Sequence, residues 1–259
     1  MPFTISHVAA ALPFLRHLSR LRVLSAVVIG SMVPDFGMFL PWRPQRIETH
    51  SIIGLYAFCL PVGLACWWLF QRLIKPAMLE LLPDPAYVQS RDRSVDLGKM
   101  SQWVAAVAGV FFGALTHLIW DGFTHEGARG VRMIPALDDP VVDFAGHQLL
   151  GFKLMQLASS VIGLALVIWV LWRVLHQAAV APAPTRRLGP AERHGWVAGY
   201  TATALVATAV FFVHAHWRAL ASHAMTATAN SIAIAGLRGL ALALIGVSAC
   251  LAIRLKMDG

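Results

Sequence analysis

Histidine and aspartate residues recur at the ends and breaks of the apolar segments in this sequence. His117 and Asp121 lie four positions apart in Thr116-His117-Leu118-Ile119-Trp120-Asp121, so on a helix both face the same side. Imidazole and carboxylate groups are common ligands of zinc and similar ions, and this pair can hold one ion, or its carboxylate can bridge two. An ionisable pair inside an apolar helix is costly and usually has a function. The alternative is a helix end that reaches interfacial water.

Three further residues occupy comparable positions. Asp35 directly follows Pro34, which interrupts an apolar segment, and a broken helix is tolerated at membrane depth where it lines a polar cavity. His50 begins another apolar segment, and His7 lies in a short one near the N-terminus. Each of them alone is more typical of a helix end. Together with His117 and Asp121 they form the nitrogen and oxygen ligand set of a catalytic metal site with open positions.

Weaker candidates extend this set. His125 follows the pair closely, and Gly122 and Gly127 let the chain turn and bring His125 back toward it. His147 lies in the same polar loop and is a more distant candidate. The last candidates are two polar residues within an apolar segment, Gln156 and Ser159. They either support the ligands from behind or pack helices together.

The composition indicates that membrane helices position these residues. Hydrophobic residues make up 58% of the 259 positions and charged residues 13%, whereas a soluble domain has about 45–50% and about 25%. A membrane helix needs roughly 20 mostly apolar residues. The segments that qualify are 52–74, 101–120, 150–174, 195–216 and 231–254, with a broken span over 23–40 and a short helix over 4–17.

The predicted fold class is therefore all-α: a polytopic integral membrane helical bundle with five spans, one broken span and a short N-terminal helix. We expect a single membrane domain over 1–259, with the metal site in 1–160 and further helices in 161–259. The net charge is +8, and the basic residues flank apolar segments, which indicates a membrane and not a nucleic acid as the partner. Lys and Arg concentrate in 72–100, in 173–193 and at the C-terminus. These parts are predicted to be cytoplasmic in a bacterial inner membrane, which leaves the ligands on the outer face.

Four motifs carry a resemblance to known proteins: Pro2-Phe3-Thr4-Ile5-Ser6-His7, Gly30-Ser31-Met32-Val33-Pro34-Asp35, Thr49-His50-Ser51, and the segment from His117 to His125. They resemble an uncharacterised bacterial membrane family whose relatives are labelled membrane-bound metal-dependent hydrolases. The order His, Asp, His, His-x-x-x-Asp, His is also similar to that of the zinc-dependent phospholipase C and nuclease group.

The second resemblance implies an all-helical scaffold and phosphodiester hydrolysis by water that one to three zinc ions activate. The implied ligands are Asp35, His50, His117 and Asp121 for one ion, His7 and a bridging Asp121 for a second, and His125 with His147 for a third. Two features depart from that group. The last ligands of that group are His-x-x-x-Glu, whereas Gly151 stands four positions after His147 here. The soluble group also uses its free N-terminus as a ligand, a role that is not carried over to Met1.

Three functions follow as hypotheses. The first is a membrane-embedded hydrolase that uses a divalent metal, zinc in the first place, on a lipid or lipid-linked phosphoester, with Asp35 or Asp121 as ligand or catalytic base. The second is a transporter or metal-handling protein in which the same residues bind an ion in transit, as the broken segment indicates. The third is a non-catalytic membrane protein.

Overall fold

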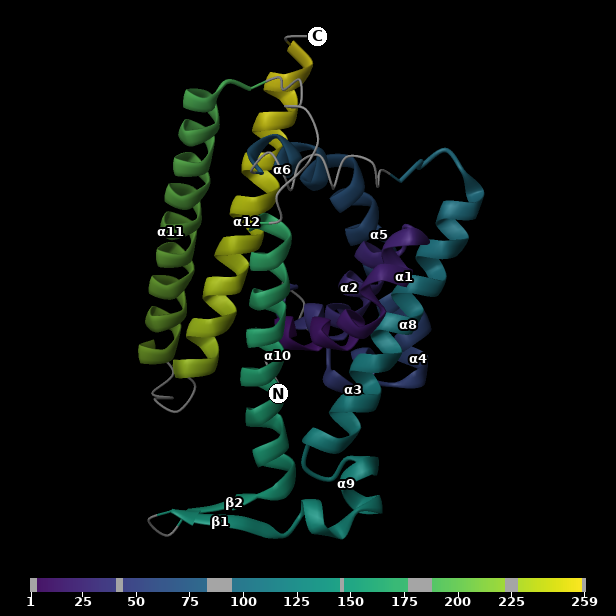
Figure 1. Cartoon of the computed structure of the whole chain (residues 1–259). Helices are drawn as coiled ribbons and strands as arrows, with labels where there is room; N and C mark the ends of the chain where they lie inside the picture. Colours follow the sequence, from purple (N-terminus) through teal and green to yellow (C-terminus); the bar gives the residue numbers. More distant parts are fainter. Residues whose placement is uncertain are drawn as a thin grey trace. The chain divides into compact units, whose positions relative to one another are not determined.

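The computed structural model describes residues 4–40, 44–82, 95–144, 147–176, 188–221 and 228–257 (Figure 1). Five helical stretches are long and apolar enough to cross a membrane: Ile52–Leu81, Met100–Thr124, Gly151–Arg173, Pro190–Val213 and Gly236–Leu255. The all-α class and the helical membrane bundle are thereby confirmed, and the chain is an integral membrane protein. The segments over 4–14 and 24–39 form shorter apolar helices.

The chain divides into two compact units, Met1–Trp67 with Arg93–His176, and Trp68–Asp92 with Gln177–Gly259. The expectation of a single domain stays a prediction. In chain order the first unit contains η1 (Thr4–Phe14), α1 (Leu15–Arg20), α2 (Leu24–Met32), η2 (Val33–Phe39), α3 (Arg46–Thr49), α4 (Ile52–Gly54), η3 (Leu55–Cys59), most of α5 (Leu60–Leu69), α8 (Met100–Thr124), α9 (Arg129–Met133), η5 (Pro135–Leu137), β1 (Pro140–Phe144), β2 (His147–Leu150) and α10 (Gly151–His176).

Helix α8 is the central element of the first unit, and α2 packs along it (Figure 1). Two glycines permit this close approach. A Cβ on Gly113 would lie 2.6 Å from the backbone nitrogen of Ser31, and a Cβ on Gly30 would lie 2.8 Å from Cα of Val110. Both separations are too short for any larger residue, so the two helix backbones touch directly. A core cluster of Val33, Leu55, Cys59 and Ala114 lies beside this contact.

Near Pro34 the chain changes from an α-helix to a 3-10 helix and remains helical. Helix α2 gives way to the 3-10 helix η2, in which Pro34 occupies the first turn, where its missing N–H is tolerated. Asp35 lies in this first turn and is 1% exposed. The predicted break therefore places a buried carboxylate beside α8.

The segment after α8 differs from the expected loop in two ways. Helix α8 continues through Gly122 to Thr124, so the turn falls later, at His125–Gly127, where Gly127 has a φ of 65°. Strands β1 and β2 then form an antiparallel hairpin in which Val142 is opposite Leu149. The hairpin was not predicted. Its valines, Val141 and Val142, are adjacent and both exposed, so the strand lacks the alternation of apolar and polar residues that indicates a strand.

The second unit contains η4 (Phe70–Ile74), α6 (Lys75–Leu81), α11 (Pro190–Ala221) and α12 (Thr228–Met257). Helices α11 and α12 lie side by side. Tyr200 donates a hydrogen bond to the carbonyl of Leu244 and also bonds the hydroxyl of Ser248. Ala77, Leu188, Leu251 and Leu255 form the core cluster of this unit.

Candidate metal centre

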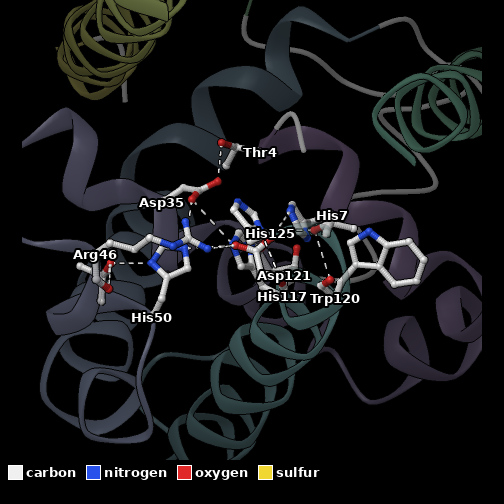
Figure 2. A network of polar contacts seen from close by, with 12 residues as sticks. Thr4, His7, Asp35, Arg46, His50, His117, Trp120, Asp121 and His125 are labelled. Carbon is white, nitrogen blue, oxygen red and sulfur yellow. Dashed lines mark hydrogen bonds and ion pairs between the residues drawn. The ribbon is translucent and has the colours of Figure 1, made fainter. Parts of the chain in front are cut away.

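Six of the predicted ligands lie in one cluster within the first unit (Figure 2). Three of them come from the short helical segments before α8: His7 lies in η1, Asp35 in η2, and His50 between α3 and α4. The other three are His117 and Asp121 on one face of α8, and His125 directly after it. The cluster thus joins residues that are more than 100 positions apart in the sequence, which only the packing of these elements achieves.

Three side chains can share one metal ion: Asp35, His50 and His117 each offer a ligand atom within 4.8 Å of the other two. Nε2 of His50 lies 3.4 Å from Oδ1 of Asp35 and 3.5 Å from Oδ2 of Asp121. Nε2 of His117 lies 3.7 Å and 3.5 Å from the same two oxygens. Ligands about 2.0–2.2 Å from a tetrahedral ion stand roughly 3.3–3.6 Å apart. The contacts of His50 and His117 with Asp35, at 3.4 and 3.7 Å, are close to this spacing and longer than hydrogen bonds, which are about 2.7–3.2 Å long.

Hydrogen bonds behind the imidazoles fix which nitrogen faces the cluster. Nδ1 of His117 lies 2.8 Å from the carbonyl oxygen of Ser31, to which it can only donate. Nδ1 of His50 lies 2.7 Å from the hydroxyl of Thr49, which itself donates to the carbonyl of Arg46. In the neutral, metal-binding form, these bonds would place the proton of both rings on Nδ1 and leave Nε2 directed to the cluster. This second layer of partners is characteristic of metal-binding histidines.

The centre of the cluster is rich in buried polar atoms without hydrogen-bond partners among the described residues. They are Nε2 of His7, His50, His117 and His125, and Oδ1 of Asp35 and Asp121. An unpartnered buried polar atom costs about 1–3 kcal/mol, and more when it is charged. Six such atoms within one cluster would be strongly destabilising unless a cation satisfied them. The donor set, imidazole nitrogen and carboxylate oxygen, is that of zinc and similar divalent ions.

A second group of candidate ligands adjoins the first but shares a member with it. His7, His117 and Asp121 also offer ligand atoms within 4.8 Å of one another. The rings of His7 and His117 stack with centroids 3.8 Å apart. Because His117 has only one free nitrogen, it can serve one ion at a time. A second ion would depend on His7 and Oδ1 of Asp121, which are 3.7 Å apart.

The surroundings keep the outer histidines neutral. Burial, and next to it the neighbouring His117, lowers the pKa of His7 to about 4. Burial also lowers the pKa of His125. Neutral imidazole is the form that binds metals. A hydrogen bond fixes the orientation of Asp35: its Oδ2 accepts a bond of 2.7 Å from the hydroxyl of Thr4.

Arg46 is a member of the cluster that was not predicted. Its Nη2 donates a 2.6 Å hydrogen bond to Oδ2 of Asp121, and its side chain is 43% exposed. In the sequence it resembles any basic residue near the end of a span. The one available signal is its spacing, four positions before His50 within the turn of α3.

The remaining candidates lie farther from the ligands. Gln156 is buried and donates to the carbonyl of Thr124, so it supports the end of α8. Ser159 donates to the carbonyl of Gln156 within α10. His147 begins β2, and its side chain lies outside the described part of the structure. Their roles stay predictions.

The chain matches the family described as Domain of unknown function (DUF4184) over residues 1–249 and belongs to it. The match includes every residue of the cluster. No curated protein and no solved structure matches the chain.

Proposed function

We propose that this member of the DUF4184 family is a membrane-embedded, metal-dependent hydrolase that acts on a lipid or lipid-linked phosphoester. The observation that carries the proposal is the convergence of Asp35, His50 and His117, whose ligand atoms lie within 4.8 Å of one another. Three protein ligands leave the fourth position of a tetrahedral ion for water or substrate. A divalent ion bound there would polarise a phosphoryl group and lower the pKa of water. The resemblance of the ligand order to zinc-dependent phospholipases supports a phosphoester as the substrate.

The two carboxylates suit different roles. Asp35 commits Oδ2 to Thr4 and directs Oδ1 toward His50 and His117. Asp121 directs Oδ2 toward the same histidines, whereas its Oδ1 has no hydrogen-bond partner among the described residues. Oδ1 of Asp121 is therefore the better-placed acceptor for a proton from water, and Asp35 serves as a ligand only.

The position of the cluster supports a lipid substrate. Asp121 lies three residues before the end of α8, about 5 Å along the helix axis, so the cluster belongs near one boundary of the membrane. Ile47, Ile52 and Ile53 flank Arg46 and His50 in the sequence and are 71%, 69% and 79% exposed. Apolar side chains beside a polar site suit a molecule with both a headgroup and acyl chains. The distribution of Lys and Arg favours the outer face of a bacterial inner membrane.

Elemental analysis of the purified full chain tests the metal. We expect zinc, manganese or iron to copurify, and Asp35→Asn or His117→Ala to lose it, because each removes a ligand. His176→Ala is the matched control, since His176 is exposed and bonds only the carbonyl of Trp172 in its own helix. Wild-type protein without a bound transition metal, also after incubation with these ions, would contradict the proposal.

A metal transporter is the second candidate, favoured by the change from α2 to η2 at Pro34, because transporters bind ions at interrupted helices. Reconstitution separates the two functions. A hydrolase shows metal-dependent cleavage of a lipid phosphoester that Asp121→Ala abolishes, with no flux. Metal uptake into liposomes that depends on Asp121, without turnover, would favour the transporter.

A further inference from the structure

We propose that Arg46 is the anion-binding residue of this centre and that it binds a phosphate group of the substrate. The inference rests on the proposed function, since it assigns a substrate-binding role at the same site. It begins from a geometric observation: the guanidinium of Arg46 contacts Asp121 at 2.6 Å, and it is the one Lys or Arg side chain with a hydrogen bond or ion pair to the six ligand candidates among the described residues.

Charge balance around the centre argues for this role. Asp35 and Asp121 carry two negative charges, and Arg46 offsets one of them. A divalent ion would offset both carboxylates, so that the guanidinium would leave the loaded site with one net positive charge. Glu48 forms no ion pair with Arg46 among the described residues, because its carboxylate turns to the backbone of Gln45 at the start of α3. A metal-loaded site of this kind attracts an anion.

The accessibility of the guanidinium argues in the same direction. A group whose purpose is to neutralise a buried carboxylate would itself be buried, as Asp121 is, with a side chain 5% exposed. The side chain of Arg46 is instead 43% exposed. A guanidinium has five N–H donors, and the donors other than the one bound to Asp121 make no hydrogen bond or ion pair with the described residues. Planar guanidinium groups with free donors bind phosphate with two parallel hydrogen bonds.

The contact with Asp121 then has a positioning effect. It holds the guanidinium beside Oδ2, the oxygen that also faces His50 and His117. A phosphate group with one oxygen bound to an ion held by these residues would present its remaining oxygens to Arg46. The expected ligand is therefore a phosphate monoester or diester, carried either by a lipid headgroup or by a soluble molecule.

Phosphate binding by the metal-loaded full chain in micelles of a phosphate-free maltoside detergent tests the proposal, with inorganic phosphate as the probe and calorimetry as the readout. We expect Arg46→Gln to weaken phosphate binding roughly 10- to 100-fold, the loss of a charge-assisted bidentate contact. Arg46→Lys keeps the charge but loses the planar fork, and its affinity should lie between the two. Arg129→Gln is the matched control, because Arg129 is exposed after the same end of α8 and contacts no ligand; its affinity should equal that of the wild type.

Metal content, measured on the same samples, separates the two proposals. Wild-type protein that binds no metal overturns the proposed function. Full metal content combined with unchanged phosphate affinity in Arg46→Gln, or with no phosphate binding by the wild type, overturns the role of Arg46 alone. Loss of metal from both Arg46→Gln and Arg46→Lys would make Arg46 a part of the metal centre and would also overturn the anion-binding role.

Competition distinguishes the source of the phosphate group. Phosphatidic acid added to the micelles should weaken the apparent affinity of the wild type for inorganic phosphate if the ligand is a lipid headgroup. Glycerol phosphate in solution should do so if the ligand is soluble. Either competition should be absent in Arg46→Gln, and competition that persists undiminished in this variant contradicts the proposal.

Discussion

At the scale of single residues, the candidate centre depends on hydrogen bonds that orient the ligands from behind. His50 is held by the hydroxyl of Thr49, which is 3% exposed, and His117 by a backbone carbonyl. Without such a partner an imidazole can rotate or protonate the nitrogen that should face the ion. Partners of this kind typically contribute a factor of about 10–100 to metal affinity.

Thr49→Val is the direct test of this orientation. Valine has the shape of threonine but cannot accept the proton of His50 Nδ1, so we expect metal affinity to fall about 10- to 100-fold while the chain still folds. Competition with a chelator of known affinity measures the change. Thr201→Val serves as the control, because its exposed hydroxyl bonds only the carbonyl of Val197 in α11. Equal chelator resistance of Thr49→Val and the wild type would show that Thr49 has no orienting role.

The ligand candidates were predictable from sequence, whereas their partners were not. His7, Asp35 and His50 stand out because, together with His117 and Asp121, they form a set of imidazole and carboxylate groups at the breaks and ends of apolar segments. Thr49 and Arg46 have no such contrast, since hydroxyl and basic residues are common near the ends of spans. Arg46 reaches Asp121 across 75 positions, and a contact at that separation depends on the fold. That the cluster binds a metal stays a prediction.

At the scale of elements, the close contact between α2 and α8 brings the two halves of the ligand set together. Helix α2 leads directly to Asp35, and its Ser31 carbonyl accepts the bond from His117. The added Cβ of an alanine at position 113 would lie 2.6 Å from the nitrogen of Ser31. The helices would have to separate at the point where they orient the ligands.

Gly113→Ala should therefore impair the centre without altering any ligand. Forcing a methyl group into such a contact costs about 1–3 kcal/mol, and we expect a lower thermal unfolding temperature together with weaker metal binding. The control lies on the same helix: Gly122 is adjacent to Asp121, yet a Cβ there meets nothing within 4 Å. Gly122→Ala should leave both properties close to those of the wild type. Equal behaviour of the two variants would refute the role of the close helix contact.

The helices themselves were predictable in number but not in their ends. Hydropathy gives the segments that the membrane must cover, and all five are present. It does not detect where backbone hydrogen bonding stops, so α8 extends beyond the predicted end at 120 to Thr124, and α11 begins at Pro190 instead of 195. Proline at the first position of a helix is a start signal that hydropathy ignores.

At the scale of the whole molecule, the distribution of Lys and Arg predicts on which side of the membrane the cluster lies. Segments rich in Lys and Arg are retained in the cytoplasm. The segment 72–100 before α8 contains Arg72, Lys75, Arg91, Arg93 and Lys99. The start of α8 is therefore predicted to face the cytoplasm, and its end, which carries Asp121, the outside.

Single cysteines at the two ends of α8 test this orientation. Lys99 and Glu126 are both exposed, and the span Met100–Thr124 separates them. In a background with Cys66 and Cys250 replaced by alanine, a membrane-impermeant maleimide added to intact cells should label Glu126→Cys but not Lys99→Cys. Cys59 can remain, because it is 0% exposed. Permeabilised cells should show labelling of both variants, which controls for reactivity. The opposite pattern would place the candidate centre on the cytoplasmic side, and its phosphoester substrate would then have to come from the inner leaflet.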